Sequence, residues 1–319
     1  MLEPGGTSTR RGCEYFLRVI PSLDGLPQAV QTAIRQVQSP DPIRQIFYIP
    51  SQQYPIQRTV WGRSLAFGWR RTPPRTLAFG VDHITVVEGL DAQNTLHIPL
   101  SDLLTIRLVT VLLYSYIELV WRVGDQTQMI KVEFNSVGSR HIEKELVHVR
   151  TWIAAQEARP VSWPEISIQH FPLKFFNYSM MSLLPGEQII GGVFEPAIQG
   201  GGLLSPAIAP NRAVILTEQH LIIISDHYTG SRETSINTYR MDRCYCPRAQ
   251  VTQIQFEPQA RASWLTITLA QGVYDIRLPL LEPRATEFFT TLEAWLSGVS
   301  ISSQPHVLAA SAPGPLALS

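Results

Sequence analysis

The stretch Ile215-Leu216-Thr217-Glu218-Gln219-His220-Leu221-Ile222-Ile223-Ile224 indicates a β-hairpin. Its two apolar runs are rich in β-branched residues, which favour strands, and the polar residues between them favour a turn. Short apolar runs of the same kind recur on both sides of this stretch, separated by turn residues. The sequence therefore predicts a mainly β protein.

Strand-like and helix-like segments follow one another in an ordered series along the chain. The predicted strands cover residues 43–49, 77–81, 84–87, 103–108, 116–123, 128–134, 188–190, 214–217, 221–224, 251–256, 264–269 and 274–280. Apolar residues spaced three and four apart instead predict helices at residues 23–38, 142–153 and 288–296. Each long series of strands is thus followed by a helix.

The two series of strands form an internal repeat. His83-Ile84 matches His220-Leu221, and Ile98-Pro99-Leu100-Ser101-Asp102-Leu103 aligns with Cys246-Pro247-Arg248-Ala249-Gln250-Val251. A set of matches in the same order indicates a duplicated domain. The repeat is too long for a solenoid unit, so we expect each copy to hold its own core.

These residues resemble the pleckstrin-homology-like fold, in its bacterial PH and GRAM-type branch. The hairpin at residues 215–224 is similar to the family's pair of strands around a Thr-acid turn, and residues 98–103 are similar to its I-P-x-x-x-I strand. Trp152 and Trp295 fit its closing helix. The resemblance covers nearly all of both copies. It implies two tandem, partly open barrels, each closed by a C-terminal α-helix, in addition to the N-terminal helix.

The sequence and the resemblance together predict five segments. They are an N-terminal arm with one amphipathic helix (1–41), PH-like domain A (42–157), a linker (158–179), PH-like domain B (180–298) and a disordered tail (299–319). Prolines mark the linker. The tail combines prolines and small residues with no Asp, Glu, Lys or Arg, so it has little with which to hold a docked structure.

The composition excludes several classes of protein. The chain has 319 residues, and its 26 Lys and Arg balance its 26 Asp and Glu, so the net charge is zero. This balance excludes a histone-like nucleic-acid binder and an acidic disordered chain. The sequence has no uncharged apolar run of about 18 residues, so no transmembrane segment is expected. We expect a cytoplasmic protein, or one peripheral at the membrane, without a nucleic-acid partner.

No motif predicts a metal, a cofactor or a catalytic residue. Cys244 and Cys246 form a lone C-x-C without a second knuckle, and His141 and His148 share a helix face without a third ligand. Proteins of the family that the chain resembles are non-catalytic modules for lipid head groups, peptides or proteins. We therefore expect a binding or scaffolding protein that recognises a protein partner or an anionic membrane surface. The alternative is a small-ligand sensor or enzyme that uses the cleft between the two copies.

The first candidate site is a basic stretch of copy A. Its members are Arg58, Arg63, Arg70, Arg71 and Arg75. No acidic residue occurs between Asp41 and Asp82, and aromatic residues are interleaved, which fits an anionic membrane surface, an acidic peptide or a phosphate. The alternative is that these arginines are solvated or paired locally. If the stretch binds an anionic surface, replacing the first four arginines with Gln is expected to abolish binding and leave the fold intact.

The second candidate site is an apolar connection between two strands of copy A. Its members are Val111, Leu112, Leu113 and Tyr114, whereas the aligned connection of copy B, residues 257–262, reads as an ordinary polar turn. Such a connection is either buried or forms an exposed patch. Four interpretations stay open: packing against copy B or the N-terminal helix, extension of the strands, a partner or homodimer surface, and insertion into a membrane.

Overall fold

The computed structural model describes residues 16–37, 42–60, 63–156, 163, 165–198, 209–226, 240–259, 262–281 and 284–297. These residues form antiparallel sheets and four α-helices, and none of their sheets closes into a barrel. The predicted mainly β class is confirmed. The tail expected at residues 299–319 lies outside the described part of the chain.

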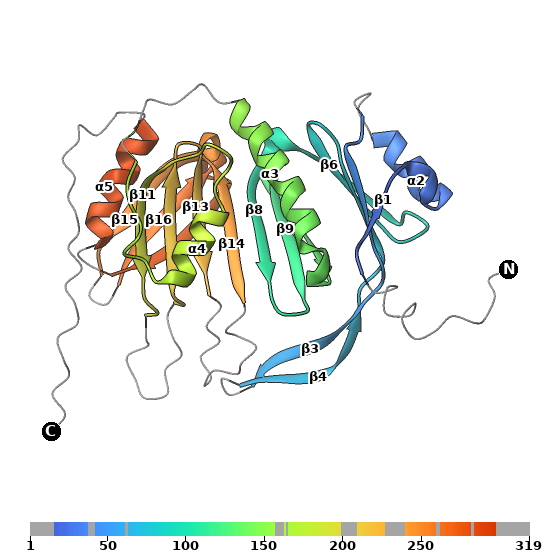
Figure 1. Cartoon of the computed structure of the whole chain (residues 1–319), viewed down its shortest axis with the longest axis horizontal. Coiled ribbons are helices and arrows are strands. Elements are labelled where there is room, and N and C mark those ends of the chain that lie inside the picture. Colours follow the sequence, from blue (N-terminus) through green and yellow to red (C-terminus); the bar gives the residue numbers. More distant parts are fainter. Residues whose placement is uncertain are drawn as a thin grey trace.

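A five-stranded sheet forms the first half of copy A (Figure 1). Its order is β1 (Arg18–Ile20), β2 (Gln45–Ile49), β5 (Arg75–Phe79), β6 (His83–Glu88) and β7 (Asn94–Pro99). Helix α2 (Gln28–Val37) packs on it through Val30 and Ile34, which confirms the predicted N-terminal helix. Between β2 and β5 the chain forms a two-stranded arm, β3 (Gln53–Val60) and β4 (Arg63–Arg71), which the sequence analysis did not predict.

A seven-stranded sheet joins the two copies. Its order is β10 (Gln126–Phe134), β9 (Ser115–Val123), β8 (Leu103–Thr110), β14 (Met241–Pro247), β13 (His220–Ser225), β12 (Arg212–Thr217) and β11 (Ile189–Glu195). The first three strands belong to copy A and the last four to copy B. Strands β8 and β14 lie side by side in Figure 1 and pair over residues 106–110 and 241–245. Across this junction the Arg107 Nε lies 2.9 Å from both carboxylate oxygens of Asp242.

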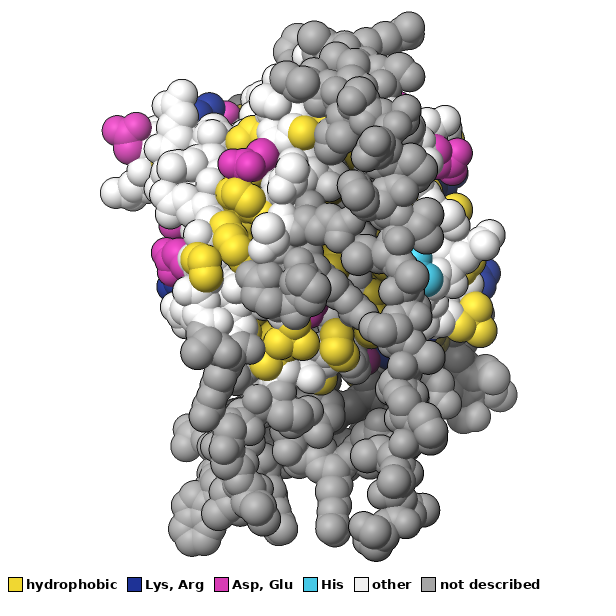
Figure 2. Space-filling model, turned by 90° about the vertical axis from the view of Figure 1, so that its left-hand side faces the viewer, with side chains coloured by type: hydrophobic (Ala, Val, Ile, Leu, Met, Phe, Trp, Pro, Cys, Tyr) yellow, Lys and Arg dark blue, Asp and Glu magenta, His cyan; other side chains and the backbone are white. Residues whose placement is uncertain are grey.

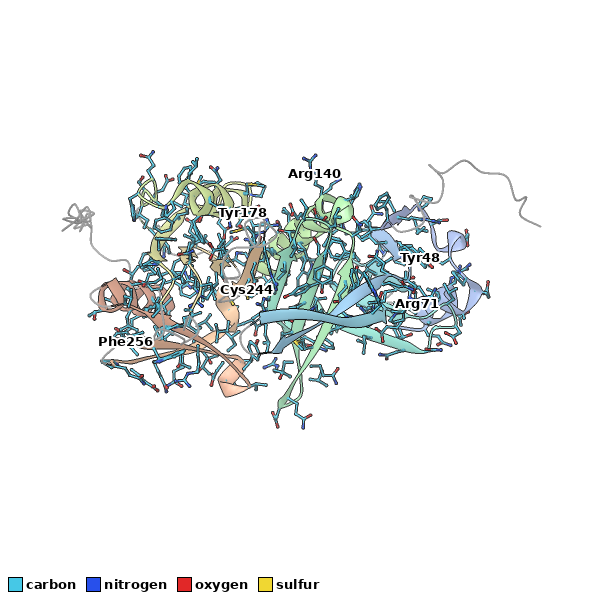
Figure 3. All side chains as sticks on the ribbon, turned by 90° about the horizontal axis from the view of Figure 1, so that it is seen from below. Tyr48, Arg71, Arg140, Tyr178, Cys244 and Phe256 are labelled. Carbon is cyan, nitrogen blue, oxygen red and sulfur yellow. The ribbon has the colours of Figure 1, made fainter. Side chains whose placement is uncertain are left out.

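Both faces of the copy B strands are covered. Helices α3 (Ser139–Ala155) and α4 (Leu173–Met181) lie on one face of the seven-stranded sheet. The other face is covered by the sheet of β15 (Val251–Glu257), β16 (Ser263–Leu269) and β17 (Tyr274–Leu280), together with α5 (Arg284–Ser297). Figure 3 shows Arg140 and Tyr178 on the side of α3 and α4, and Phe256 on the opposite side.

Burial on both faces explains why the hairpin of β12 and β13 is rich in Ile. Along β12 and β13, Ile215 and Ile222 pack with the core that contains Phe175 of α4. Their neighbours Leu216 and Leu221 pack with the core that contains α5. Successive side chains of a strand point to opposite faces, so a strand buried on both faces is apolar at nearly every position.

The predicted repeat is visible in the backbone pairing of the two copies. His83 pairs with Pro99 in copy A, and His220 pairs with Pro247 in copy B. In both copies the paired strand then enters a single 3₁₀ turn, η2 (Leu100–Asp102) or η5 (Arg248–Gln250). The two copies therefore share one connection geometry at corresponding residues.

The expectation that each copy holds its own core is wrong. One continuous core contains Leu108 and Ile117 of copy A together with Ile215 and Tyr245 of copy B. The reason is the β8–β14 pair: it continues one sheet from copy A into copy B, and α3 and α4 cover the joint. Two separate barrels are accordingly not seen among the described strands.

The two tryptophans of the closing helices differ in burial. Trp295 is fully buried, and its indole Nε1–H donates to the carbonyl oxygen of Thr217 at 2.8 Å. Trp152 is only half-buried against the first core.

Candidate functional site

An open groove lies between α3 and α4, over the junction of β8 and β14. Its volume is about 280 Å³. The lining residues are Leu108, Arg140, Glu143, Lys144, Leu146, Val147, Arg150, Met181, Arg243 and Tyr245. Residues of copy A on β8 and α3 and residues of copy B on α4 and β14 all contribute, so the groove exists only where the two copies meet.

Helix α3 forms one wall of the groove. Arg140, Glu143, Lys144 and Val147 are spaced three and four apart, which places their side chains on one side of a helix. Arg140 and Lys144 are exposed at the rim, and Figure 3 shows Arg140 pointing away from the sheet. This wall therefore presents two accessible cations.

Strand β14 supplies part of the floor. Arg243 and Tyr245 lie two apart on the strand, so both point to the side of α3 and α4. The Arg243 Nη2 donates to Glu143 Oε1 at 2.6 Å, and only 4% of the Arg243 side chain is exposed. Its Nε–H has no hydrogen-bond partner among the described residues. Because this atom is itself buried, Arg243 closes the floor of the groove and does not present the donor to its opening.

Arg150 is the second buried cation of the floor. Its guanidinium lies over the Tyr245 ring at 4.1 Å, and its Nη1 donates to the carbonyl oxygen of Ser182 at 2.7 Å. Its Nη2 lies 3.5 Å from the carboxylate of Glu187, while its Nε has no partner within the described part of the chain. Burial lowers the pKa of Arg150, and Tyr245 and Glu187 oppose that shift. A guanidinium stays charged at neutral pH regardless.

The lining carries a surplus of positive charge. Arg243 is paired with Glu143 and Arg150 with Glu187 behind the lining, so Arg140 and Lys144 at the rim make up the surplus. In a recessed site water screens charge less than on an open surface, so the surplus attracts anions more strongly there. For comparison, Figure 2 shows a different part of the surface, the α5 end, where few described Lys and Arg side chains are visible. The groove is therefore suited to bind an anionic group.

A buried polar network lies behind the groove and holds Arg150 in place. The Glu187 carboxylate accepts hydrogen bonds from His220 Nδ1 at 2.9 Å, from the backbone N–H of Leu184 at 2.7 Å, and from the Thr217 hydroxyl. Burial raises the pKa of Glu187, but the hydrogen bond to His220 and the charge of Arg150 outweigh burial and the net pKa is lowered. Burial and the charge of Arg150 lower the pKa of His220.

Glu187 and His220 are residue types that act as acid–base pairs, but a substrate has no access to them. The side chain of Glu187 is 1% exposed and that of His220 is 0% exposed. The His220 Nε2 also has no partner among the described residues, which fits a neutral ring whose proton is on Nδ1. A substrate cannot reach either group without opening the core, so the pair supports the fold.

The matching histidine of copy A has a different environment. His83 Nδ1 lies 2.7 Å from Asp82, and its ring packs on that of His97. Gly80 occupies the position that Thr217 has in copy B, and a Cβ at Gly80 would lie 2.4 Å from the His83 ring. The sequence match between His83 and His220 therefore does not indicate a shared site.

Within the predicted basic stretch, two arginines pair with carboxylates and a third is exposed. Arg70 donates two hydrogen bonds to Glu133, and Arg75 donates to Glu88 at 2.7 Å. Arg71 is exposed and donates to the Ser51 hydroxyl at 2.8 Å. The other two arginines lie on β3 and β4, but their side chains lie outside the described part; they are Arg58 and Arg63. Local pairing thus holds for Arg70 and Arg75.

Replacing Arg70 with Gln is expected to lower the free energy of unfolding by about 1–3 kcal/mol, because it leaves a buried carboxylate without its bidentate partner. Glu133 is only 4% exposed, whereas Arg70 is 44% exposed. Arg71→Gln is the matched control, since Arg71 is adjacent and exposed. It is expected to change stability by less than about 0.5 kcal/mol. Equal effects in urea unfolding would contradict the assignment.

This pairing changes an expectation from the sequence. A fourfold Gln variant that includes Arg70 is expected to lose about 1–3 kcal/mol of stability from this pair alone, although Glu133 keeps the hydrogen bond from Tyr114 and lies 3.6 Å from Lys131 Nζ. Burial raises the pKa of Glu133, but Arg70 and Tyr114 outweigh burial, and the net pKa is lowered. A test of the basic stretch therefore has to use Arg71.

The predicted apolar connection is the tip of a tight hairpin between β8 and β9. The Val111 N–H donates to the Tyr114 carbonyl oxygen at 2.8 Å, which leaves Leu112 and Leu113 as the two turn residues. They are 60% and 68% exposed, so they pack neither against copy B nor against α2. Tyr114 instead turns back to Glu133. The partner, dimer or membrane role of Leu112 and Leu113 stays a prediction.

No group of His, Cys, Asp and Glu among the described residues could hold a metal ion. Cys246 is buried on β14, and the hydrogen bond with Cys244 and burial raise the pKa of its thiol well above the ordinary value. A raised pKa keeps it a thiol, which is neither the nucleophilic nor the ligating form. Within the same described residues, no helix has the length and apolar character needed to span a bilayer.

The sequence analysis missed the groove, although part of its signal was present. The basic residues Arg140 and Lys144 lie four apart on a predicted helix, which indicates one cationic helix face. Nothing local indicated that Arg243 would lie opposite them.

Comparison with known proteins gives no match: the chain fits no family model and no curated protein.

Proposed function

We propose that the protein is a non-catalytic binding protein that takes an anionic group of its partner into the groove between α3 and α4. The observation that carries this proposal is the rim of the groove, where the cations Arg140 and Lys144 are exposed. The carboxylates of Glu143 and Glu187 are already paired with Arg243 and Arg150, which close the floor beneath the rim. Charge-assisted hydrogen bonds from exposed cations to an anionic group are stronger than neutral ones.

The scaffold that we propose for this groove is a tandem pair of PH-like domains. The order of elements supports it, because each copy has a sheet of strands, a 3₁₀ turn, three further strands and a closing helix in the same order. The three strands after the turn are β8 to β10 in copy A and β15 to β17 in copy B. A scaffold of this kind presents binding residues at its edges and joints without supplying chemistry of its own.

Binding is favoured over catalysis by the kinds of side chain that line the groove. General acid–base and nucleophilic catalysis need a base placed within reach of a reacting atom. The strongest acid–base pair, Glu187 with His220, is sealed in the core. The groove offers guanidinium and ammonium groups instead, which bind anions and stay charged.

The test is charge reversal at the rim. The full chain with Arg140→Glu and Lys144→Glu is compared with wild type as bait in the organism's own lysate, and bound proteins are identified by mass spectrometry. A variant with Arg18→Glu and Arg277→Glu makes the same change of charge at exposed positions on β1 and β17. We expect the rim variant to lose the bound proteins and the control variant to keep them.

Two outcomes would contradict the proposed function. Equal retention by both variants would remove the groove from the binding site. Flotation with anionic liposomes that depends on Arg71 and not on Arg140 would assign the function to the basic stretch of copy A instead. Circular dichroism of all variants checks that the fold is intact.

A further inference from the structure

We infer that the groove receives an acidic amphipathic segment of a protein partner, in which carboxylates are interleaved with apolar side chains. This inference rests on the proposed function and names the class of partner for the same site. It follows from the two unlike sides of the groove, one cationic and one apolar, and from the size and depth of the space between them.

Apolar side chains line the space beside the cations. They are Leu108, Leu146, Val147 and Met181. Met181 is 66% exposed on α4, so it forms an open apolar rim across the groove from α3. Leu173 and Met180 are also exposed, but they lie on the solvent side of α4, away from the groove. Methionine side chains adapt to different apolar partners.

The cationic side is the facing wall of α3. Arg140 and Lys144 lie four apart at its rim, which matches carboxylates spaced three or four apart on a helical segment or two apart on an extended one. Behind them, Arg243 lies on the floor and already contacts one carboxylate, that of Glu143. A segment between the two helices therefore meets cations on one side and apolar groups on the other.

The size and depth of the groove favour side chains of a segment over other ligands. Its volume of about 280 Å³ is at the lower limit of sites that enclose a small molecule. The groove is recessed between α3 and α4, so a projecting side chain fits it better than a flat bilayer surface does. Leu108, Leu146 and Val147 also line the space, which suits a carboxylate carried on an apolar stem better than an inorganic anion.

The inference is tested by peptide selection. A random peptide library displayed on phage is selected on the full chain and counter-selected on the Arg140→Glu, Lys144→Glu variant. Enriched peptides are then measured by fluorescence anisotropy. We expect them to contain Asp or Glu interleaved with Leu, Ile, Phe or Met. We expect the rim variant to weaken binding on the order of tenfold, and added salt to weaken it further.

Two further variants separate the two sides of the groove. Met181→Ser removes an exposed apolar contact and is expected to weaken the peptides severalfold without changing the fold. The Arg18→Glu, Arg277→Glu variant is expected to bind them as wild type does. Persistence of binding in both the rim variant and Met181→Ser would overturn the inference.

Three other results would overturn the inference. The first two are failure to enrich any peptide and enrichment of peptides without Asp or Glu. The third is displacement of bound peptide by inorganic phosphate but not by acetate at equal ionic strength, which would indicate a site for phosphoryl groups. If the peptides fail while the rim variant still loses its bound proteins from lysate, the partner class is wrong and the proposed function stands. If both fail, the groove is not the binding site.

Discussion

Replacing Trp295 with Ala is expected to lower the free energy of unfolding by about 3–5 kcal/mol, because the change removes a large side chain from a closed core. The Trp295 side chain is 0% exposed and packs with Leu292 and Phe288 of α5 against β15 and β16. The substitution also leaves the buried carbonyl oxygen of Thr217 without the indole donor. The loss approaches the whole stability of a typical domain.

Two other tryptophans serve as graded controls in urea unfolding followed by circular dichroism. Trp152 is half-buried at the matching position of α3, so Trp152→Ala is expected to have a smaller effect. Trp69 is 69% exposed on the arm, so Trp69→Ala is expected to change stability by less than about 0.5 kcal/mol. A Trp295→Ala protein as stable as Trp69→Ala would show that α5 does not close the second core.

Replacing Glu187 with Ala is expected to cost about 3–5 kcal/mol of stability, because it leaves a buried cation without its partner. Arg150, His220 and Thr217 all lose their contact with this carboxylate, and the Leu184 N–H loses its acceptor. Glu257→Ala is the control, since Glu257 is 51% exposed and its contact with Arg277 is at the surface. A similar small loss for both variants would contradict the role of the network.

The same network predicts a pH dependence of stability. The folded state lowers the pKa of His220, so the unfolded chain binds more protons below about pH 6.5, the ordinary histidine pKa, and stability falls as the pH decreases from there. The folded state also lowers the pKa of Glu187, so a second loss begins below about pH 4.3. Glu187→Ala removes this second loss. Wild-type stability that rises toward acid pH would contradict both assignments.

Most strands and all three predicted helices could be located from sequence because their signals are local. The apolar runs of β12 and β13 and the three- and four-residue spacing in α3 depend only on which faces of each element are buried. The arm of β3 and β4 was missed although Leu65, Phe67 and Trp69 of β4 alternate with small or polar residues, because Pro55 interrupts the pattern in β3. Helix α4 was missed because the prolines that precede it suggested a linker, although a proline is common at the start of a helix, where Pro172 lies.

The candidate sites were harder to predict because their partners are distant in sequence. The basic stretch contains no acid, yet Glu133 pairs with Arg70 across 63 residues. Likewise, Arg243 meets Glu143 across 100 residues. Counting charges along a stretch cannot reveal such pairs, since they depend on which strands become neighbours. The groove depends on the β8–β14 pair, and no local pattern specifies that pair.

The pairing of β8 with β14 also limits how this duplicated chain can change in evolution. Backbone N–H and C=O groups of residues 106–110 are satisfied by those of residues 241–245. Loss of either copy would leave the other with an open strand edge, which promotes aggregation. Separate exchange or loss of one copy therefore carries a cost that independent domains do not have. A recombination point between these two strands would separate the pair.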